Sequence, residues 1–122
     1  MFDTNFVMIL VEKSSYIIEG INRLLDPVIF VVPSCVKEEL LRLSHSRYVK
    51  KSKISSLALC MVQSHMKVIE TPKEGSVDDR IIAYARNKDN VFIATMDREL
   101  RKRLVIENLK CITLSNNKVV LC

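Results

Sequence analysis

The chain has little glycine, proline or cysteine, and these shortages limit what kind of protein it can be. Its 122 residues include two glycines, three prolines, four cysteines and no tryptophan. So little glycine and proline leaves no room for a flexible linker or a low-complexity segment. Because hydrophobic residues make up 48% of the chain, the composition predicts one domain over residues 1–122 with a substantial buried core.

Long apolar runs and paired cysteines are also missing. No stretch approaches the roughly 20 residues that a membrane span needs, and no signal-peptide pattern opens the chain, so we expect a cytoplasmic protein with no membrane partner. No CxxC pair is present, which argues against a zinc site and predicts reduced, mostly buried thiols. The cysteines concerned are Cys35, Cys60, Cys111 and Cys122.

What the chain does contain is an alternation of strand and helix patterns. Strands are predicted at 28–32 and 91–95, which read as buried on both faces, and at 67–70, 111–114 and 118–121, the last at an edge. An apolar stretch at 6–11 precedes the first predicted helix. Helices are predicted from Ser14 or Ser15 to Leu25, from Cys35 to Leu43, from after the basic segment 47–53 to about Met66, from Ser76 to about Lys88 and from Met96 to Leu104. This alternation predicts an α/β protein with a parallel sheet covered by helices on both faces.

The helix after Gly75 has two neighbouring acids with different predicted roles. Ser76 is spaced as an N-cap, and Asp79 lies three residues on, as a capping box requires. Asp78 falls at the edge of the apolar side of the same helix. A carboxylate directed toward a packed side costs several kcal/mol unless something compensates its charge, and a metal ion is a usual compensation.

Three further acids are predicted near the same edge of the sheet. Asp3 and Asp97 each follow a predicted strand, and Glu39 flanks the apolar side of its helix whereas Glu38 lies on the far side. Ligands of parallel sheets bind outside the carboxyl ends of the strands, and carboxylate oxygens are the ligands that Mg²⁺ and Mn²⁺ prefer. A site for one or two such ions is therefore one hypothesis.

Each acid also has an alternative role that needs no metal. Asp3 and Asp97 are placed to cap the helices that they precede. Asp78 would interact favourably with a helix dipole, and Glu39 would suit a solvated helix surface. Spacing alone leaves both interpretations open.

Four segments together resemble the PIN-domain ribonucleases in order and spacing. They are Asp3-Thr4-Asn5, the helix segment 35–40, the segment 76–81 and Ala94-Thr95-Met96-Asp97. The residues of these segments are most similar to those of single-domain PIN nucleases of small-subunit ribosomal RNA maturation, and VapC-type toxins share the same acids. The resemblance covers almost the whole chain, although its first strand, Met1-Phe2, is shorter than is usual in that family.

The resemblance implies a three-layer α/β/α sandwich around a central parallel sheet and a metal-dependent endoribonuclease activity. It assigns Asp3, Glu39, Asp78 and Asp97 as metal-holding catalytic acids, with Asn5 and Thr95 as supporting residues. The implied cofactor is Mg²⁺ or Mn²⁺, which activates a water for attack on phosphorus. The rival interpretations are a VapC-type toxin with an antitoxin partner and a non-catalytic module that binds RNA or protein.

Basic residues supply a candidate RNA surface. The net charge is +5, which allows a polyanionic partner without requiring one. Arg98, Arg101 and Lys102 share one predicted helix face directly after Asp97, where they either contact phosphates or face solvent. A ribosome-assembly protein is a further candidate partner, and the apolar residues from Leu57 to Val62 belong to the core or to a homodimer interface.

Overall fold

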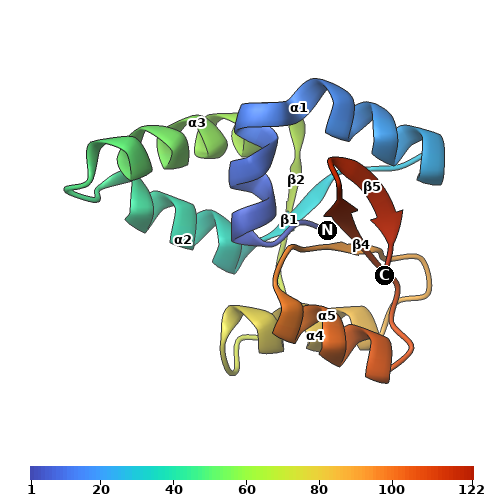
Figure 1. Ribbon diagram of the computed structural model, residues 1–122. Helices are drawn as coiled ribbons and strands as arrows, with labels where there is room; N and C mark the ends of the chain where they lie inside the picture. The colour runs from blue at the N-terminus through green and yellow to red at the C-terminus, as the bar shows by residue number, and fades with distance from the viewer.

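A computed structural model describes residues 1–122, with the side chain of Ser14 excepted. Five helices and five short strands follow one another along the chain (Figure 1). In order they are α1 (Thr4–Leu25), β1 (Val31–Pro33), α2 (Ser34–Ser44), α3 (Val49–His65), β2 (Lys67–Ile69), α4 (Val77–Arg86), β3 (Ile93–Ala94), α5 (Arg98–Ile106), β4 (Cys111–Ser115) and β5 (Lys118–Leu121).

Phe2 joins two small sheets into one layer. Strands β1 and β2 pair in parallel, as do β3 and β4, while β5 pairs antiparallel to β4 at the edge. Phe2 makes a parallel bridge to Ala94 of β3, and its backbone N–H donates to the carbonyl of Val31 in β1 at 3.0 Å. The N-terminal segment thus lies between the two sheets, and its carboxyl end leads directly into Asp3.

Alternating side chains show that helices cover both faces of this layer. Phe2, Ala94 and Ile112 pack into one cluster with apolar residues of α1, α2 and α3. Their neighbours Met1, Ile93 and Cys111 pack into a second cluster with α4 and α5. In Figure 1, α1 lies above the strands, and α4 and α5 lie below them. The predicted three-layer α/β/α arrangement is confirmed.

The first helix differs from the prediction. The apolar stretch 6–11 is not separate from the helix predicted to begin at Ser14 or Ser15, because α1 already begins at Thr4 and is interrupted by the non-helical backbone of Lys13 (φ −136°, ψ 33°). Phe6, Val7 and Leu10 are fully buried, and their spacing of three and four residues matches one helix face. Asp3, as N-cap, starts the helix earlier than the prediction placed it.

The strands are shorter than predicted at two places. The run 28–32 was expected to be buried on both faces, but β1 begins only at Val31 and Ile29 is 77% exposed. The strand predicted at 91–95 reduces to Ile93–Ala94.

The last helix begins at Arg98, not Met96, because Asp97 caps it. No helix among the described residues is long and apolar enough to cross a bilayer.

The prediction of reduced, mostly buried thiols is wrong. Cys111 and Cys122 form a disulfide, and of the two free thiols Cys35 is buried but Cys60 is exposed. The pairing follows from the β4–β5 hairpin, whose register places Ile112 opposite Leu121. Asn116 and Asn117, both at positive φ, form the two-residue turn that such hairpins favour. A turn at 116–117 places position 111 opposite position 122, so the sequence held this signal.

Candidate active site

Asp3 lies at the point where the N-terminal segment leaves the sheet. It is only 5% exposed, and its backbone N–H donates to the carbonyl of Ala94 at 3.2 Å. Its Oδ1 accepts from the N–H of Phe6 at 2.9 Å, which makes it the N-cap of α1. Its Oδ2 accepts a short hydrogen bond from the Thr95 hydroxyl. The carboxylate is therefore fixed from the backbone side and from the neighbouring strand.

Thr95 links Asp3 to Asp97. The Thr95 side chain is fully buried, donates to Asp3 and accepts the backbone N–H of Asp97 at 3.0 Å. Asp97 caps α5 through Oδ1 alone, which accepts from Glu99 N at 2.8 Å and from Leu100 N at 3.4 Å. The cap roles considered for Asp3 and Asp97 are therefore real. Capping uses only one carboxylate oxygen of each residue. The second oxygen of Asp3, Oδ2, accepts from Thr95, and the described residues give Oδ2 of Asp97 no hydrogen bond.

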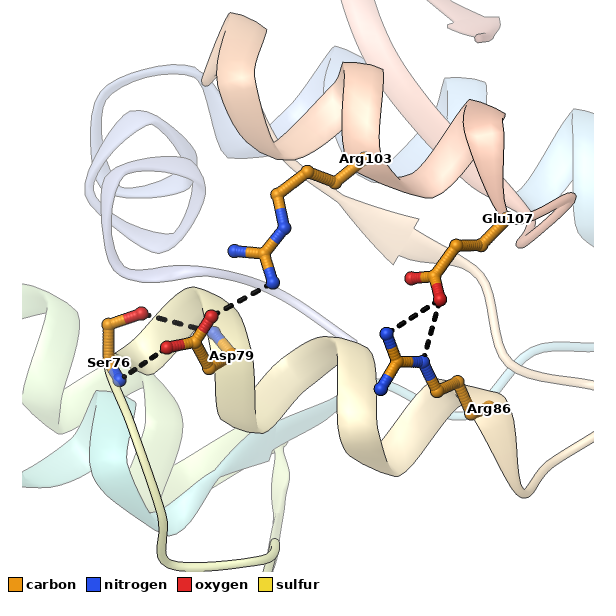
Figure 2. A network of polar contacts seen from close by, with 5 residues as sticks. All are labelled: Ser76, Asp79, Arg86, Arg103 and Glu107. Carbon is orange, nitrogen blue, oxygen red and sulfur yellow. Dashed lines mark hydrogen bonds and ion pairs between the residues drawn. The ribbon is translucent and has the colours of Figure 1, made fainter.

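The neighbouring acids of α4 divide as the capping pattern predicted. The Asp79 Oδ2 accepts from the Ser76 N–H at 3.0 Å, and the Ser76 hydroxyl accepts from the Asp79 N–H at 3.2 Å. Figure 2 shows this capping box and the ion pair that Asp79 also makes with Arg103 of α5 at 2.8 Å. Asp78 has no hydrogen bond or ion pair with the described side chains, and it is half-buried.

Arg103 of α5 interacts with the acids of α4, a role that the sequence patterns did not reveal. It pairs with Asp79, and its charge partly opposes the rise in the pKa of Asp78 that burial and the charge of Asp97 cause. A second ion pair, between Arg86 of α4 and Glu107 at the end of α5, lies beside it at 2.6 Å (Figure 2). The two pairs join the exposed sides of α4 and α5, whose buried side chains pack together in one apolar cluster. Pairs between sequence-distant helices leave no pattern in the sequence, so this role had no signal.

Electrostatics show that the acids share one region. Burial raises the pKa of Asp3 to about 6, against hydrogen bonds from Thr95 and Phe6, and the charges of Asp78 and Asp97 raise it further. Burial also raises the pKa of Asp78, and the charge of Asp97 adds to that effect.

Glu39 belongs to the same group, since its charge raises the pKa of Asp78 as well. It is half-buried on α2 while Glu38 is exposed, as the helix pattern predicted. Asp3, Asp78 and Asp97 therefore repel one another at the carboxyl edge of the sheet, and Glu39 repels Asp78.

The donor chemistry fits a hard divalent cation, although not as a closed cage. Among the described residues, no three Asp, Glu, His or Cys side chains are close enough together to hold an ion as they stand. Mg²⁺ keeps several of its waters and binds through one or two carboxylates. Two carboxylates fit a hydrated ion of that kind. Asp3 is held in place by its hydrogen bonds, and Asp97 has one carboxylate oxygen without a hydrogen bond among the described residues.

The remaining predicted site residues lie in different surroundings. Asn5 is exposed in the first turn of α1 and makes no side-chain hydrogen bond with the acids among the described residues. Arg98, Arg101 and Lys102 together line one surface groove with Val105, Ile106 and Cys122. The groove begins at the residue after Asp97. Of the residues predicted for an interface, Val62 is fully buried whereas Leu57 is 49% exposed.

Comparison with known proteins defines the class. The family described as a PIN-like domain matches residues 1–117. Ribonuclease VapC4 of Methanocaldococcus jannaschii is 33% identical over 119 residues, covering 95% of this chain and 89% of that protein. The solved structure of the PIN domain endonuclease Utp24 superposes with a TM-score of 0.78 at 22% identity, over 98% of this chain and 87% of the other.

The α/β/α fold with acids at the carboxyl edge of its sheet is thus the fold of the PIN domains. The chain belongs to the PIN-like domain family, the family of the PIN-domain ribonucleases. This confirms the resemblance drawn from the segments around Asp3, Glu39, Asp78 and Asp97.

Proposed function

We propose that this protein is a metal-dependent endoribonuclease that hydrolyses phosphodiester bonds of single-stranded RNA. The observation that carries the proposal is the convergence of four acids: the charges of Asp78 and Asp97 help to raise the pKa of Asp3, and those of Asp97 and Glu39 help to raise the pKa of Asp78. Membership of the PIN-like family and the relationship to a protein named ribonuclease VapC4 support it.

The chain's own residues would divide the work. Asp3, held by Thr95 and the N–H of Phe6, and Asp97, through its second oxygen, would hold the ion most directly. Asp78 and Glu39, both half-buried, would complete the negative field around it. A bound Mg²⁺ or Mn²⁺ would supply an activated water and neutralise charge on the phosphate. Asp79 would act only by positioning, through the start of α4 and through Arg103.

The groove on α5 would bind the RNA strand. Arg98 and Lys102 are exposed there, and Nε of Arg101 is buried without a hydrogen-bond partner among the described residues. A buried guanidinium N–H normally has an acceptor, and a phosphate oxygen would supply one. Val105 and Ile106 give the same groove apolar surface on which a base can rest.

Removing the α5 charges tests this surface. We expect that replacing Arg98, Arg101 and Lys102 together by Ala weakens RNA binding and flattens its salt dependence. For single-stranded RNA the slope of log K against log salt should fall by about 0.7 for each phosphate that the protein no longer neutralises. The measurement is RNA affinity at several salt concentrations, with Lys50→Ala/Lys51→Ala/Lys53→Ala on α3 as a control of equal charge. An unchanged slope would leave α5 as a plain solvated face.

Metal removal tests the function itself. We expect cleavage of single-stranded RNA with Mn²⁺ or Mg²⁺ and none in EDTA, since carboxylates by themselves do not activate water at neutral pH. Activity should return when Mn²⁺ is added in excess of the chelator. Full cleavage in EDTA would exclude the metal mechanism. Tight RNA binding with no cleavage under any metal would instead identify the non-catalytic module.

A toxin role is the second candidate, because a relative that covers almost the whole chain is named ribonuclease VapC4. It implies a small antitoxin partner encoded beside this protein. Expression of the protein alone should then arrest growth, and Asp3→Asn should relieve the arrest. Ribosomal RNA processing with a ribosome-assembly partner, homodimer formation and a cytoplasmic location stay predictions.

A further inference from the structure

A polar pocket lies between α2 and the start of α4, outside the site described above. It has a volume of about 400 Å³. Its lining residues come from one face of α2 and from the first turn of α4 with the residue before its cap: Cys35, Glu38, Arg42, Gly75, Val77 and Arg80. Two of the six are arginines, one from each helix, and one is an acid.

The pocket adjoins the two helix segments that carry Glu39 and Asp78. Glu38 immediately precedes Glu39 on α2, and Val77 immediately precedes Asp78 on α4. The side of α4 away from the pocket faces α5. There Asp79 pairs with Arg103, and Arg86 pairs with Glu107. The acidic centre therefore has a cationic groove on its α5 side and this pocket on its α2 side.

The two arginines of the pocket are not occupied within the protein. The ion pairs of the described residues use Arg23, Arg86 and Arg103, and neither Arg42 nor Arg80 takes part in one. Glu38 and Arg42 are four residues apart on one helix, a spacing that favours pairing, yet no such pair is formed. Nε of Arg80 is buried and has no hydrogen-bond partner among the described residues.

An unpaired, buried guanidinium N–H costs free energy that an anionic acceptor would recover. Arg42 is exposed and Arg80 is half-buried, so water also enters the pocket, but water brings no negative charge to the two arginines. A group with several oxygens and negative charge satisfies both arginines at once, and a phosphate is such a group.

We propose that Arg42 and Arg80 form a phosphate-binding subsite for the RNA strand, on the side of the acidic centre opposite α5. This rests on the proposed ribonuclease function and names the part of its substrate that lies across the site from α5. The phosphate is either an internal phosphodiester of the strand or a terminal 5′-phosphomonoester. In both cases the strand crosses the acids between two cationic contacts, which holds the scissile bond over the carboxylates.

The test compares variants that change charge with opposite sign in one pocket. Arg42→Gln/Arg80→Gln removes the two cations, and Glu38→Gln removes the acid. Lys50→Gln/Lys53→Gln, on the exposed start of α3, removes the same charge elsewhere. RNA affinity and cleavage are measured for each variant on one oligonucleotide carrying either a 5′-phosphate or a 5′-hydroxyl, with melting temperature as a check on folding.

We expect the double arginine variant to bind RNA roughly 10- to 100-fold more weakly, about tenfold for each charged hydrogen bond removed. Glu38→Gln should bind RNA more tightly, a gain that a misfolded variant cannot produce. Weaker binding of both oligonucleotides identifies an internal phosphodiester, and weaker binding of the 5′-phosphate form alone identifies a terminal phosphate.

Two results would overturn the subsite. In one, the wild-type protein cleaves RNA, yet the arginine variant binds like the lysine control and Glu38→Gln changes nothing. The ribonuclease function would then survive without this pocket. In the other, the wild-type protein neither binds nor cleaves RNA with any divalent ion, and the proposed function fails together with the subsite.

Discussion

The Asp3→Asn protein should fold, bind RNA and fail to cleave it. Its carboxylate is the most buried of the acids and is oriented by Thr95 and by the N–H of Phe6. Changes to residues that merely support a metal ligand already cost 10- to 100-fold in activity or affinity. Loss of the ligand itself should therefore lower cleavage by more than about 100-fold. Asn is itself a good N-cap, so the start of α1 should be kept. The measurement is single-turnover cleavage at saturating Mn²⁺.

The same substitution should change the stability of the metal-free protein in a pH-dependent way. The pKa of Asp3 rises from 3.8 to about 6 on folding, so the folded state holds the proton more tightly than the unfolded state. Stability is unaffected by this group below about pH 4, falls as the pH rises from 4 to 6, and stays low above that. Two pKa units correspond to about 3 kcal/mol. Asp3→Asn should remove that slope, and Mn²⁺ should restore stability to the wild-type protein only. Equal pH profiles for the two proteins would contradict this.

The paired variants Asp78→Asn and Asp79→Ala should have opposite effects. Asp78→Asn removes charge from the group of mutually repelling acids, so cleavage should be lost while metal-free stability is kept or raised. Asp79→Ala removes the capping box and the pair with Arg103, so the melting temperature should fall by several degrees while turnover stays measurable. Denaturant unfolding and RNA cleavage on both variants provide the comparison.

The opposite pattern would assign the roles the other way round. If Asp79→Ala abolished cleavage and Asp78→Asn did not, the catalytic acid of α4 would be one residue further along. A control for the Arg103 contribution is Arg103→Gln, which breaks the interhelical pair but leaves the capping box of Ser76 and Asp79 in place. It should lower stability less than Asp79→Ala does.

Local patterns were the part of this structure that the sequence could predict. The capping box of Ser76 and Asp79, and the burial of Glu39 relative to Glu38, depend only on spacing within one helix. The layer arrangement followed from the alternation of strands and helices. The cap at Asp3 was considered, but the apolar stretch after it suits a strand or a helix equally, and only packing against the sheet decided for a helix.

Features that join distant segments could not be predicted in the same way. The hydrogen bonds of Thr95 with Asp3 and with the N–H of Asp97 need the N-terminal segment and β3 to be neighbours, which pattern analysis does not fix. The Asp79–Arg103 pair and the pocket of Arg42 and Arg80 depend on how helices cross. The Cys111–Cys122 disulfide is an exception, because the Asn116-Asn117 turn determines its register.

Two of the acids start helices as well as belonging to the site, and this restricts how the chain can diverge. Asp3 caps α1 and Asp97 caps α5, so an aliphatic residue at either position would remove a helix cap along with a carboxylate. Asn, Ser or Thr would remove the charge and keep the cap. A descendant that gave up catalysis but kept its fold is therefore expected to carry one of those three residues at positions 3 and 97. At position 78, where no cap is made, it would be free to carry almost any residue.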